Sequence, residues 1–428
     1  MTARTLLKNA RLLDPATGLD QKGHLLIADG KIAAVGPRAN ADSSGAAIIE
    51  CHGHCLAPGL VDMRVELREP GREHEETMET GSAAAAAGGV TTMVALPNTE
   101  PAIDDVALVE FVARRSREIR GVHIRTYAAA TRGLKGREIT EIGLLSGAGA
   151  VAFTDAHTAI ADAVVLRRAF SYARTFDALI VQHPEEPSLA AGGDMTEGEV
   201  ATRLGLSGIT PAAEVIMIER DLRLVEITGA RYHVAHVSTA AAVDAIRAAK
   251  AHGLPVTCDT APPYFALNET AVGEYRTFAK LSPPLRSEGD RRAVVAGLRD
   301  GTVDAIASDH SPHPQDSKRL PFASAEAGII GLETLLALTL ELVHNGHLTV
   351  LQAMRALSQR PAEILRLPAG RLTEGNPADL VLFDLDRPGP IDVDSFRSKS
   401  KNSPFDGRPV QGRVLKTMVE GRLVFGDG

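Results

Sequence analysis

The chain has 428 residues, a formal net charge of −8 at pH 7 and 44% hydrophobic residues. This length allows one large domain and a smaller one, and the negative charge argues against a nucleic-acid-binding surface. No apolar run approaches the roughly 20 residues that cross a bilayer, so we expect no membrane segment, and we expect no signal peptide. Only three cysteines occur, which indicates a reducing compartment, hence the cytoplasm.

Short β-strands are predicted at both ends of the chain, where turn formers separate brief apolar stretches and helical periodicity is absent. We therefore predict one small β-sandwich domain built from residues 1–56 together with residues 369–428. The predicted strands of this domain lie at 6–7, 25–27, 31–35, 47–50, 379–383, 413–419 and 422–425.

Residues 57–368 alternate apolar strands with stretches long enough for a helix. Eight such units in about 310 residues fit a (β/α)8 TIM barrel of the α/β class, and a doubly wound sheet is the alternative. A helix is predicted at 78–87, where alanines are frequent. The predicted barrel strands lie at 60–66, 91–96, 123–128, 149–154, 178–182, 231–236, 255–258 and 303–307.

Polar side chains stand at the ends of most of these predicted strands. The carboxyl ends of barrel strands share one mouth, so residues that are distant in sequence are expected to meet there. Histidines and carboxylates gathered in this way suit zinc or a similar divalent ion. Each residue alone is more often a hydrogen-bonded or solvated side chain, so the prediction depends on the joint pattern. The residues are Arg64, Glu66, Asn98, Asp155, His183, His236, Asp309 and His313.

Several motifs in this order resemble the dihydroorotases, which are cyclic amidohydrolases. They are LREPG at 67–71, GGVTT at 88–92, HVST at 236–239 and SDHSPH at 308–313. The resemblance runs from about residue 5 to 427. It implies a barrel of the amidohydrolase type, with a small β-sandwich, that takes N-carbamoyl-aspartate and dihydroorotate in pyrimidine biosynthesis.

The resemblance also implies a role for individual residues. Asp309 matches both a metal ligand and the general base that shuttles a proton. Other metal ligands of the family match His183, His236 and Asp155, and the residues that hold the substrate carboxylate match Arg68, Asn98 and His313.

The first strand departs from the family pattern. Where the family has Asp-x-His-x-His with two zinc-binding histidines, this chain has Asp62, Arg64 and Glu66. Arginine is a permanent cation and cannot bind a metal. We therefore expect the Arg64 guanidinium to fill the vacated metal position, to pair with Asp309, Asp155 or Glu66, and to weaken Asp309 as a base. Glu66 could instead join the remaining ligands around a single ion, so we expect one zinc ion or none.

Three functions stay open at this point. The first is a weak or non-catalytic dihydroorotase-like chain, a pseudoenzyme that serves as a structural partner of aspartate transcarbamoylase. The second is an active dihydroorotase that uses one zinc ion. The third is another cyclic amidohydrolase of the hydantoinase or allantoinase type, although those relatives usually carry a carboxylated lysine where Asp155 stands. We expect a homo-oligomer in each case.

Three further segments carry predictions. The charged run 72–76 is expected to be solvated and salt-bridged rather than a ligand set. Residues 398–405 are predicted to form a loop against the barrel, and residues 314–322 a flexible loop at its mouth. His157 could reach the mouth, but the sequence gives it no role.

Overall fold

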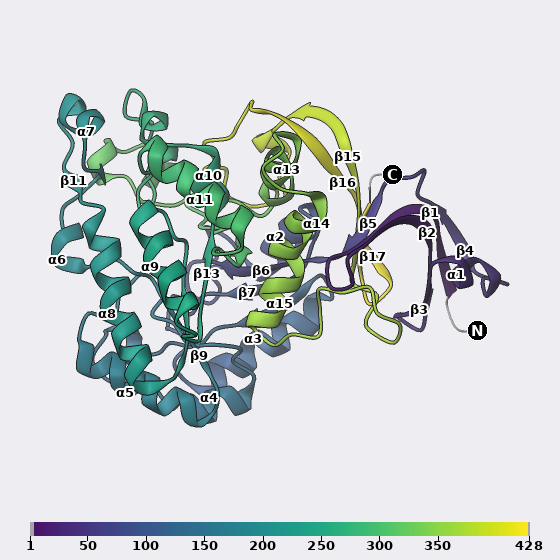
Figure 1. The fold of residues 1–428 in the computed structure, drawn as a ribbon, viewed down its shortest axis with the longest axis horizontal. Helices are drawn as coiled ribbons and strands as arrows, with labels where there is room; N and C mark the ends of the chain where they lie inside the picture. Colours follow the sequence, from purple (N-terminus) through teal and green to yellow (C-terminus); the bar gives the residue numbers. More distant parts are fainter. Residues whose placement is uncertain (1–3, 427–428) are drawn as a thin grey trace.

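The computed structural model describes residues 4–426. Figure 1 shows two parts, a large body of helices around inner strands and a smaller group of strands that contains both ends of the described chain. This arrangement confirms the predicted fold, a (β/α)8 barrel with a small β domain formed by both termini.

The terminal β domain is built on one eight-stranded sheet in the order β17-β16-β15-β5-β1-β2-β3, with β4 beside β1. Leucines of β1 and β2 pack with Leu380, Leu382 and Met418 from the other end of the chain, so both ends share one core. The predicted domain boundaries stay a prediction. The strands are β1 (Arg4–Asp14), β2 (Leu19–Ala28), β3 (Lys31–Val35), β4 (Ala47–Glu50), β5 (Cys55–Pro58), β15 (Leu380–Pro390), β16 (Pro409–Val419) and β17 (Arg422–Gly426).

The barrel strands are short, and all their pairings are parallel. Two groups, β6-β7-β8 and β9-β12-β13-β14, are joined through isolated bridges, one of which pairs Val65 with His310. This bridge places the ends of the first and last barrel strands side by side. The strands are β6 (Leu60–Val65), β7 (Val90–Ala95), β8 (His123–Thr126), β9 (Leu179–Gln182), β12 (Arg231–Val234), β13 (Val256–Thr260) and β14 (Ala305–Ile306).

The strand predicted at 149–154 is wrong in extent. Only Phe153 forms β-bridges, to Ala128 on one side and to Ile180 on the other. The preceding helix ends at Ala148, and Gly149 follows with a left-handed φ of 112°. Ala156 turns the chain again with φ 58°. The segment between these turns joins its neighbours through the two bridges and through backbone hydrogen bonds, such as that from Val151 N–H to the Thr126 carbonyl oxygen at 3.0 Å, without forming a regular strand.

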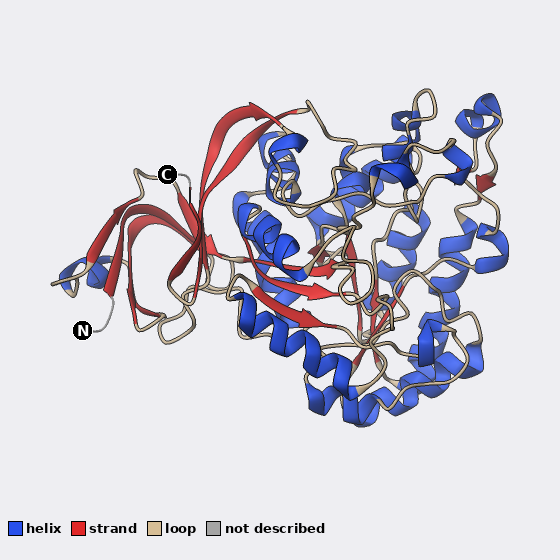
Figure 2. Ribbon diagram, turned by 180° about the vertical axis from the view of Figure 1, so that it is seen from behind, coloured by secondary structure: helices blue, strands red, loops and turns tan. Residues whose placement is uncertain are grey.

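Helices surround the barrel strands (Figure 2). The helix predicted at 78–87 is α2, and it begins where Thr77 and Thr80 form a capping box. The helices of the barrel are α2 (Met78–Ala87), α3 (Val106–Ile119), α4 (Ile142–Ala148), α5 (Ala163–Thr175), α8 (Ala212–Thr228), α9 (Ala240–Ala251), α11 (Glu288–Asp300), α13 (Leu335–His344), α14 (Val350–Met354) and α15 (Arg360–Ile364).

Short elements complete the chain. A π-helical turn at Arg355–Gln359 joins α14 to α15. Within residues 4–426, no helix combines the length and the apolar character that crossing a membrane requires. The remaining elements are α1 (Pro37–Ala41), α6 (Pro187–Ala190), α7 (Glu199–Leu204), α10 (Pro262–Ala266), α12 (Gln315–Lys318), β10 (Met195–Thr196) and β11 (Gly208–Ile209), with 3₁₀ turns at Arg132–Leu134, Glu269–Val272, Thr277–Ala279, Phe322–Ser324 and Val393–Ser395.

Candidate functional site

A cavity of about 280 Å³ opens at the carboxyl ends of the barrel strands. A concave, partly polar space at this end of a barrel is the usual location of a ligand site. Five of the predicted site residues line it: Glu66, Arg68, Asn98, Asp309 and His313. Arg64, Asp155, His183 and His236 lie outside this lining.

The backbone at the mouth adopts unusual conformations. Three predicted site residues have positive φ, namely Arg68 at 59°, His236 at 38° and Asp309 at 52°. Side chains other than glycine rarely adopt this region, and such outliers cluster at functional sites. The backbone thus supports a specialised site at the mouth of the barrel.

Arg64 and Asp309 form a buried ion pair. The Nε of Arg64 donates to Oδ1 of Asp309 at 2.7 Å, and the two side chains are only 2% and 8% exposed. The other end of the guanidinium lies 3.4 Å from the carbonyl oxygen of Ala156 and 3.4 Å from Nδ1 of His157. Of the three carboxylates expected as partners for Arg64, the structure therefore places Asp309 against it.

Glu66 turns its carboxylate toward a ring of hydrogen-bond donors. Oε2 accepts from the Asn98 amide at 2.7 Å and pairs with Arg68, while Oε1 accepts from the Ser311 hydroxyl at 2.6 Å. Nε2 of His157 lies 2.6 Å from Oε1. Burial would raise the pKa of Glu66, but the positive charges of Arg68 and His157 and these hydrogen bonds hold that pKa well below its ordinary value.

Arg68 is shared between two buried carboxylates. Its Nε lies 2.9 Å from Oε2 of Glu75, a second partner besides Glu66. Its remaining donors reach the carbonyl oxygen of Pro312 at 3.2 Å and the hydroxyl of Ser311 at 3.3 Å. All three guanidinium nitrogens of Arg68 therefore have partners within the chain.

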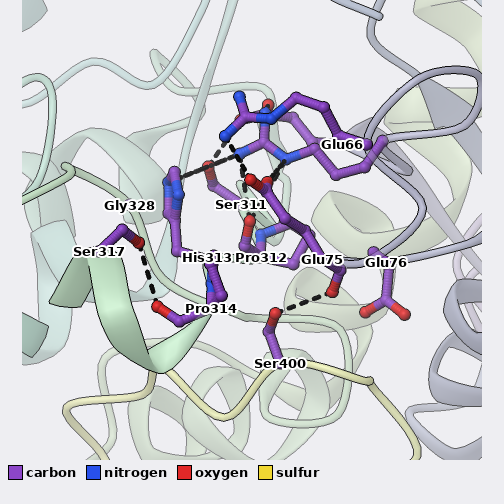
Figure 3. Close-up of polar contacts among 12 residues, drawn as sticks. Glu66, Glu75, Glu76, Ser311, Pro312, His313, Pro314, Ser317, Gly328 and Ser400 are labelled. Atoms are coloured by element: carbon purple, nitrogen blue, oxygen red, sulfur yellow. Dashed lines mark hydrogen bonds and ion pairs between the residues drawn. The ribbon is translucent and has the colours of Figure 1, made fainter.

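The charged run 72–76 is salt-bridged, as predicted, through Arg72 and Glu75, but its last two residues are not solvated. Glu75 and Glu76 are 1% and 0% exposed. The hydroxyl of Ser400 donates to the carbonyl oxygen of Glu75 at 2.8 Å, and Ser398 donates to Glu76. Figure 3 shows Glu75 and Glu76 between Ser400 and the group formed by Glu66 and Ser311. The prediction was wrong for Glu75 and Glu76, because the sequence does not show whether water or a second loop covers a charged residue.

The loop at 398–405 packs against the barrel mouth, as predicted. Asn402 accepts from the backbone N–H of His313 at 3.1 Å and donates to the carbonyl oxygen of Ser311 at 2.9 Å. The predicted mouth loop 314–322 contains α12, whose Lys318 donates to the carbonyl oxygens of Glu326 and Gly328. Both segments thereby hold the backbone around His313.

His313 is a buried neutral histidine. Burial and the nearby charge of Arg68 lower its pKa to about 3. Its Nε2 lies 2.9 Å from the carbonyl oxygen of Ala327, and Nδ1 has no hydrogen-bond partner. Nε2 also lies 3.5 Å from Arg68 and 3.4 Å from Ser311, so this nitrogen faces the other site residues.

His183 and His236 lie together, away from the predicted carboxylate ligands. Nδ1 of His183 is 3.1 Å from Nε2 of His236, and Glu185 lies 3.5 Å from the other nitrogen of His183. Burial lowers the pKa of both histidines, and the charge of Arg64 lowers it further. Both imidazoles are therefore held neutral beside a fixed cation.

Asp155 faces a loop rather than these histidines. It accepts from the backbone N–H of Thr131 at 2.8 Å and from the Thr131 hydroxyl. Burial raises the pKa of Asp155 to about 6, although these hydrogen bonds oppose the rise. The structure thus gives Asp155 a role in holding the loop after β8.

The residues as arranged do not fit a zinc ion. Within residues 4–426, no group of three or more histidine, cysteine, aspartate and glutamate side chains is placed to hold a metal. The two histidines contact each other, whereas Asp309, Glu66 and Asp155 are engaged by Arg64, Arg68 and Thr131 respectively. A tetrahedral zinc site needs at least three converging protein ligands, and the described residues do not supply them in this arrangement.

Two contributors, Glu75 and Ser311, were missed at the level of sequence, and a third, His157, was named without a role. His157 and Ser311 reach Glu66, and Glu75 shares Arg68. A signal for His157 was its position two residues beyond Asp155, at the mouth end of the fourth barrel position. No feature of the sequence indicated that Glu75 pairs with Arg68, because the path of the loop between them decides whether they meet.

Comparison with known proteins gives a consistent result. A family model described as "Dihydro-orotase-like" matches residues 53–242. The protein named "Dihydroorotase" from Anaplasma phagocytophilum (strain HZ) is 48% identical, over 97% of this chain and 94% of its own. A protein of the same name from Syntrophus aciditrophicus (strain SB) is 44% identical, over 99% of each chain. Among solved structures, L-hydantoinase (dihydropyrimidinase) from Arthrobacter aurescens superposes with a TM-score of 0.86 at 28% identity, over 100% of this chain and 97% of its own.

The Arg64–Asp309 pair leads to a prediction about stability. Arg64→Met leaves a buried carboxylate unpaired and is expected to lower the free energy of unfolding by about 3 kcal/mol or more, and Asp309→Asn leaves the guanidinium unpaired. The double variant should lose less than the sum of the two, by about 1 kcal/mol or more, in urea unfolding. As a control, Arg408→Met removes a pair with Glu341 whose side chains are 31% and 20% exposed, and should cost about 1 kcal/mol or less. Additive losses at Arg64 and Asp309 would contradict the pairing.

Asp155 leads to a prediction about pH. Its pKa is about 6 in the folded chain, against ~3.9 when unfolded. The folded chain therefore binds more protons between these values, and this group lowers the free energy of unfolding by roughly 3 kcal/mol as pH rises from about 4 to about 6. Asp155→Asn removes this loss, so the stability of the variant relative to wild type should rise over that interval. A difference that does not vary with pH would rule out the raised pKa.

Proposed function

Because the chain belongs to the dihydroorotase family, we propose that it is a dihydroorotase-like protein of pyrimidine biosynthesis whose own turnover is weak or absent. The proposal places its ligand, N-carbamoyl-aspartate or dihydroorotate, in the cavity that Arg68, Asn98 and His313 line. It assigns the chain a structural role beside aspartate transcarbamoylase.

The observation that carries this proposal is the buried ion pair between Arg64 and Asp309, 2.7 Å apart. Closing or opening the dihydroorotate ring requires a base that takes up and returns a proton. If Asp309 took up a proton, it would leave the Arg64 guanidinium buried without its counter-charge, a change that costs several kcal/mol. Asp309 is therefore restrained as a base by the residue that replaces a family histidine.

The reaction also requires activation of the amide carbonyl. Activating the amide carbonyl needs a metal ion or an equivalent arrangement of positive charge, which is the chemistry zinc supplies in this family. The donor set here does not fit that ion. Arg64 supplies positive charge at this place: its Nε donates to Asp309, Nη2 lies 3.4 Å from the carbonyl oxygen of Ala156, and the buried Nη1 has no partner.

The ligand-holding residues support retention of the pocket. Arg68, Asn98 and His313 lie around one cavity at the strand ends. Guanidinium and amide groups recognise a carboxylate through paired, charge-assisted hydrogen bonds. The unpaired Nδ1 of buried His313 adds one further polar atom. A small molecule with a carboxylate is the ligand that such a set recognises.

The proposed partner role is supported by the retained fold. The fold superposes on L-hydantoinase over 100% of this chain with a TM-score of 0.86. A chain with the complete fold of the family and a restrained site suits a scaffold. Assembly with aspartate transcarbamoylase, and a homo-oligomeric state, belong to this proposal.

A second candidate is a dihydroorotase that uses one zinc ion. It is favoured by the contact of His183 with His236 and by the buried Nδ1 of His236, which lacks a hydrogen-bond partner. This candidate requires Asp155 or Glu66 to leave its present partners. We prefer the first proposal because the absence of turnover follows from the ion pair between Arg64 and Asp309 as it stands.

Turnover distinguishes the two candidates. We expect the unmodified chain to hydrolyse dihydroorotate roughly 10²- to 10⁴-fold more slowly than a dihydroorotase with both histidines, because a free general base contributes about that factor. The variant with Arg64→His and Glu66→His, loaded with zinc, should gain both bound metal and turnover. Arg64→Lys, which keeps the positive charge, serves as the control and should gain neither. Rapid hydrolysis by the unmodified chain that a chelator abolishes would favour the single-zinc enzyme.

The partner role is tested by assembly. The purified chain is mixed with the aspartate transcarbamoylase encoded in the same genome, and the mixture is analysed by size-exclusion chromatography with light scattering. A stable complex of defined mass is expected. If the two proteins elute separately at micromolar concentration, the structural role is lost even when turnover is absent.

A further inference from the structure

The carboxylate of Glu66 sits in a complete carboxylate-binding site. Four donors surround it: the guanidinium of Arg68, the amide of Asn98, Nε2 of His157 and the hydroxyl of Ser311. The Glu66 side chain is 2% exposed. Charge-assisted hydrogen bonds from several directions are the contacts that bind a carboxylate ligand tightly.

These donors come from four separate strand ends. Arg68 follows β6, Asn98 follows β7, His157 follows the Phe153 bridge and Ser311 follows β14. All four residues also line the cavity at the mouth. In Figure 3, Glu66, Ser311 and His313 lie around one space. The donors are therefore placed where an external carboxylate would arrive.

Each guanidinium nitrogen of Arg68 is already engaged. Its three nitrogens are taken by Glu66, Glu75, Ser311 and the carbonyl oxygen of Pro312. Glu75 is 1% exposed and already places a second negative charge on this guanidinium. A third carboxylate would face two like charges at short range in a buried place, where repulsion is strong.

We propose that Glu66 is an internal occupant of a carboxylate site, so that a small carboxylate ligand binds Arg68, Asn98, His157 and Ser311 only after Glu66 has left. This proposal rests on the proposed function for the location of the ligand site. It adds that the chain regulates access to the site with one of its own side chains. Glu66, which replaces a family histidine, thereby blocks the four donors that would hold the ligand carboxylate.

The test uses chemical rescue of Glu66→Ala. Removing the side chain leaves four donors unpaired around a small space, and formate or acetate can refill it. The thermal unfolding temperature of wild type and variant is measured in sodium acetate, in sodium formate and in sodium chloride of equal ionic strength. We expect the variant to unfold at a lower temperature than wild type, and the carboxylates to raise it by about 3 °C or more. Wild type should not respond.

Two further variants make the result specific. Glu326→Ala removes another cavity-lining residue with a carboxylate, and it should not acquire a response to acetate. Adding Arg68→Met to Glu66→Ala should abolish the response, because it removes the cation of the site. Should Glu66→Ala fail to fold, Glu66→Ser, which also empties the space, is measured in the same way and should respond in the same direction.

The acetate response tests this inference, and turnover tests the proposed function. A response of equal size in wild type and in Glu66→Ala overturns the inference, since the site would be open with Glu66 in place. The absence of any response in the Glu66 variants overturns it as well. Turnover of dihydroorotate by the unmodified chain bears on the proposed function alone, because rescue by acetate does not require catalysis.

Discussion

The mouth of this barrel is held by charge pairing between residues that lie 245 positions apart in the sequence. Arg64, at the end of the first barrel strand, neutralises Asp309 beyond the last one. Two residues further along, Glu66 neutralises Arg68 and accepts hydrogen bonds from Asn98 and Ser311. Positions 64 and 66 thus carry one cation and one anion, and each pairs with a group of opposite charge.

These two pairs underlie both proposals. Under the first, the cation beside Asp309 restrains the base; under the second, the carboxylate on Arg68 fills the place of a ligand carboxylate. Buried ion pairs add little net stability, but removal of one partner is costly. Replacing Arg64 or Glu66 alone would therefore leave a buried charge unpaired, and the native pairs avoid that cost.

The sequence predicted the fold well where patterns are local. The alanine-rich helix was placed at 78–87, where α2 lies, and the terminal strands were recognised because turn formers bound them. The strand at 149–154 was overestimated because an apolar run does not reveal that its backbone forms bridges to its neighbours at Phe153 alone. The sequence also placed Arg64, Glu66 and Asp309 at one mouth. It did not predict that Glu66 would fold back onto Arg68, since a carboxylate can serve a metal or a guanidinium equally well.

The most direct measurement is a crystal structure of the unmodified chain grown with zinc, with anomalous data collected at the zinc absorption edge. The account predicts the Arg64 guanidinium against Asp309, the Glu66 carboxylate against Arg68, and no anomalous peak between Glu66 and Asp309. A well-occupied zinc ion ~2.0–2.2 Å from these two carboxylates, with Arg64 turned away from Asp309, would contradict it.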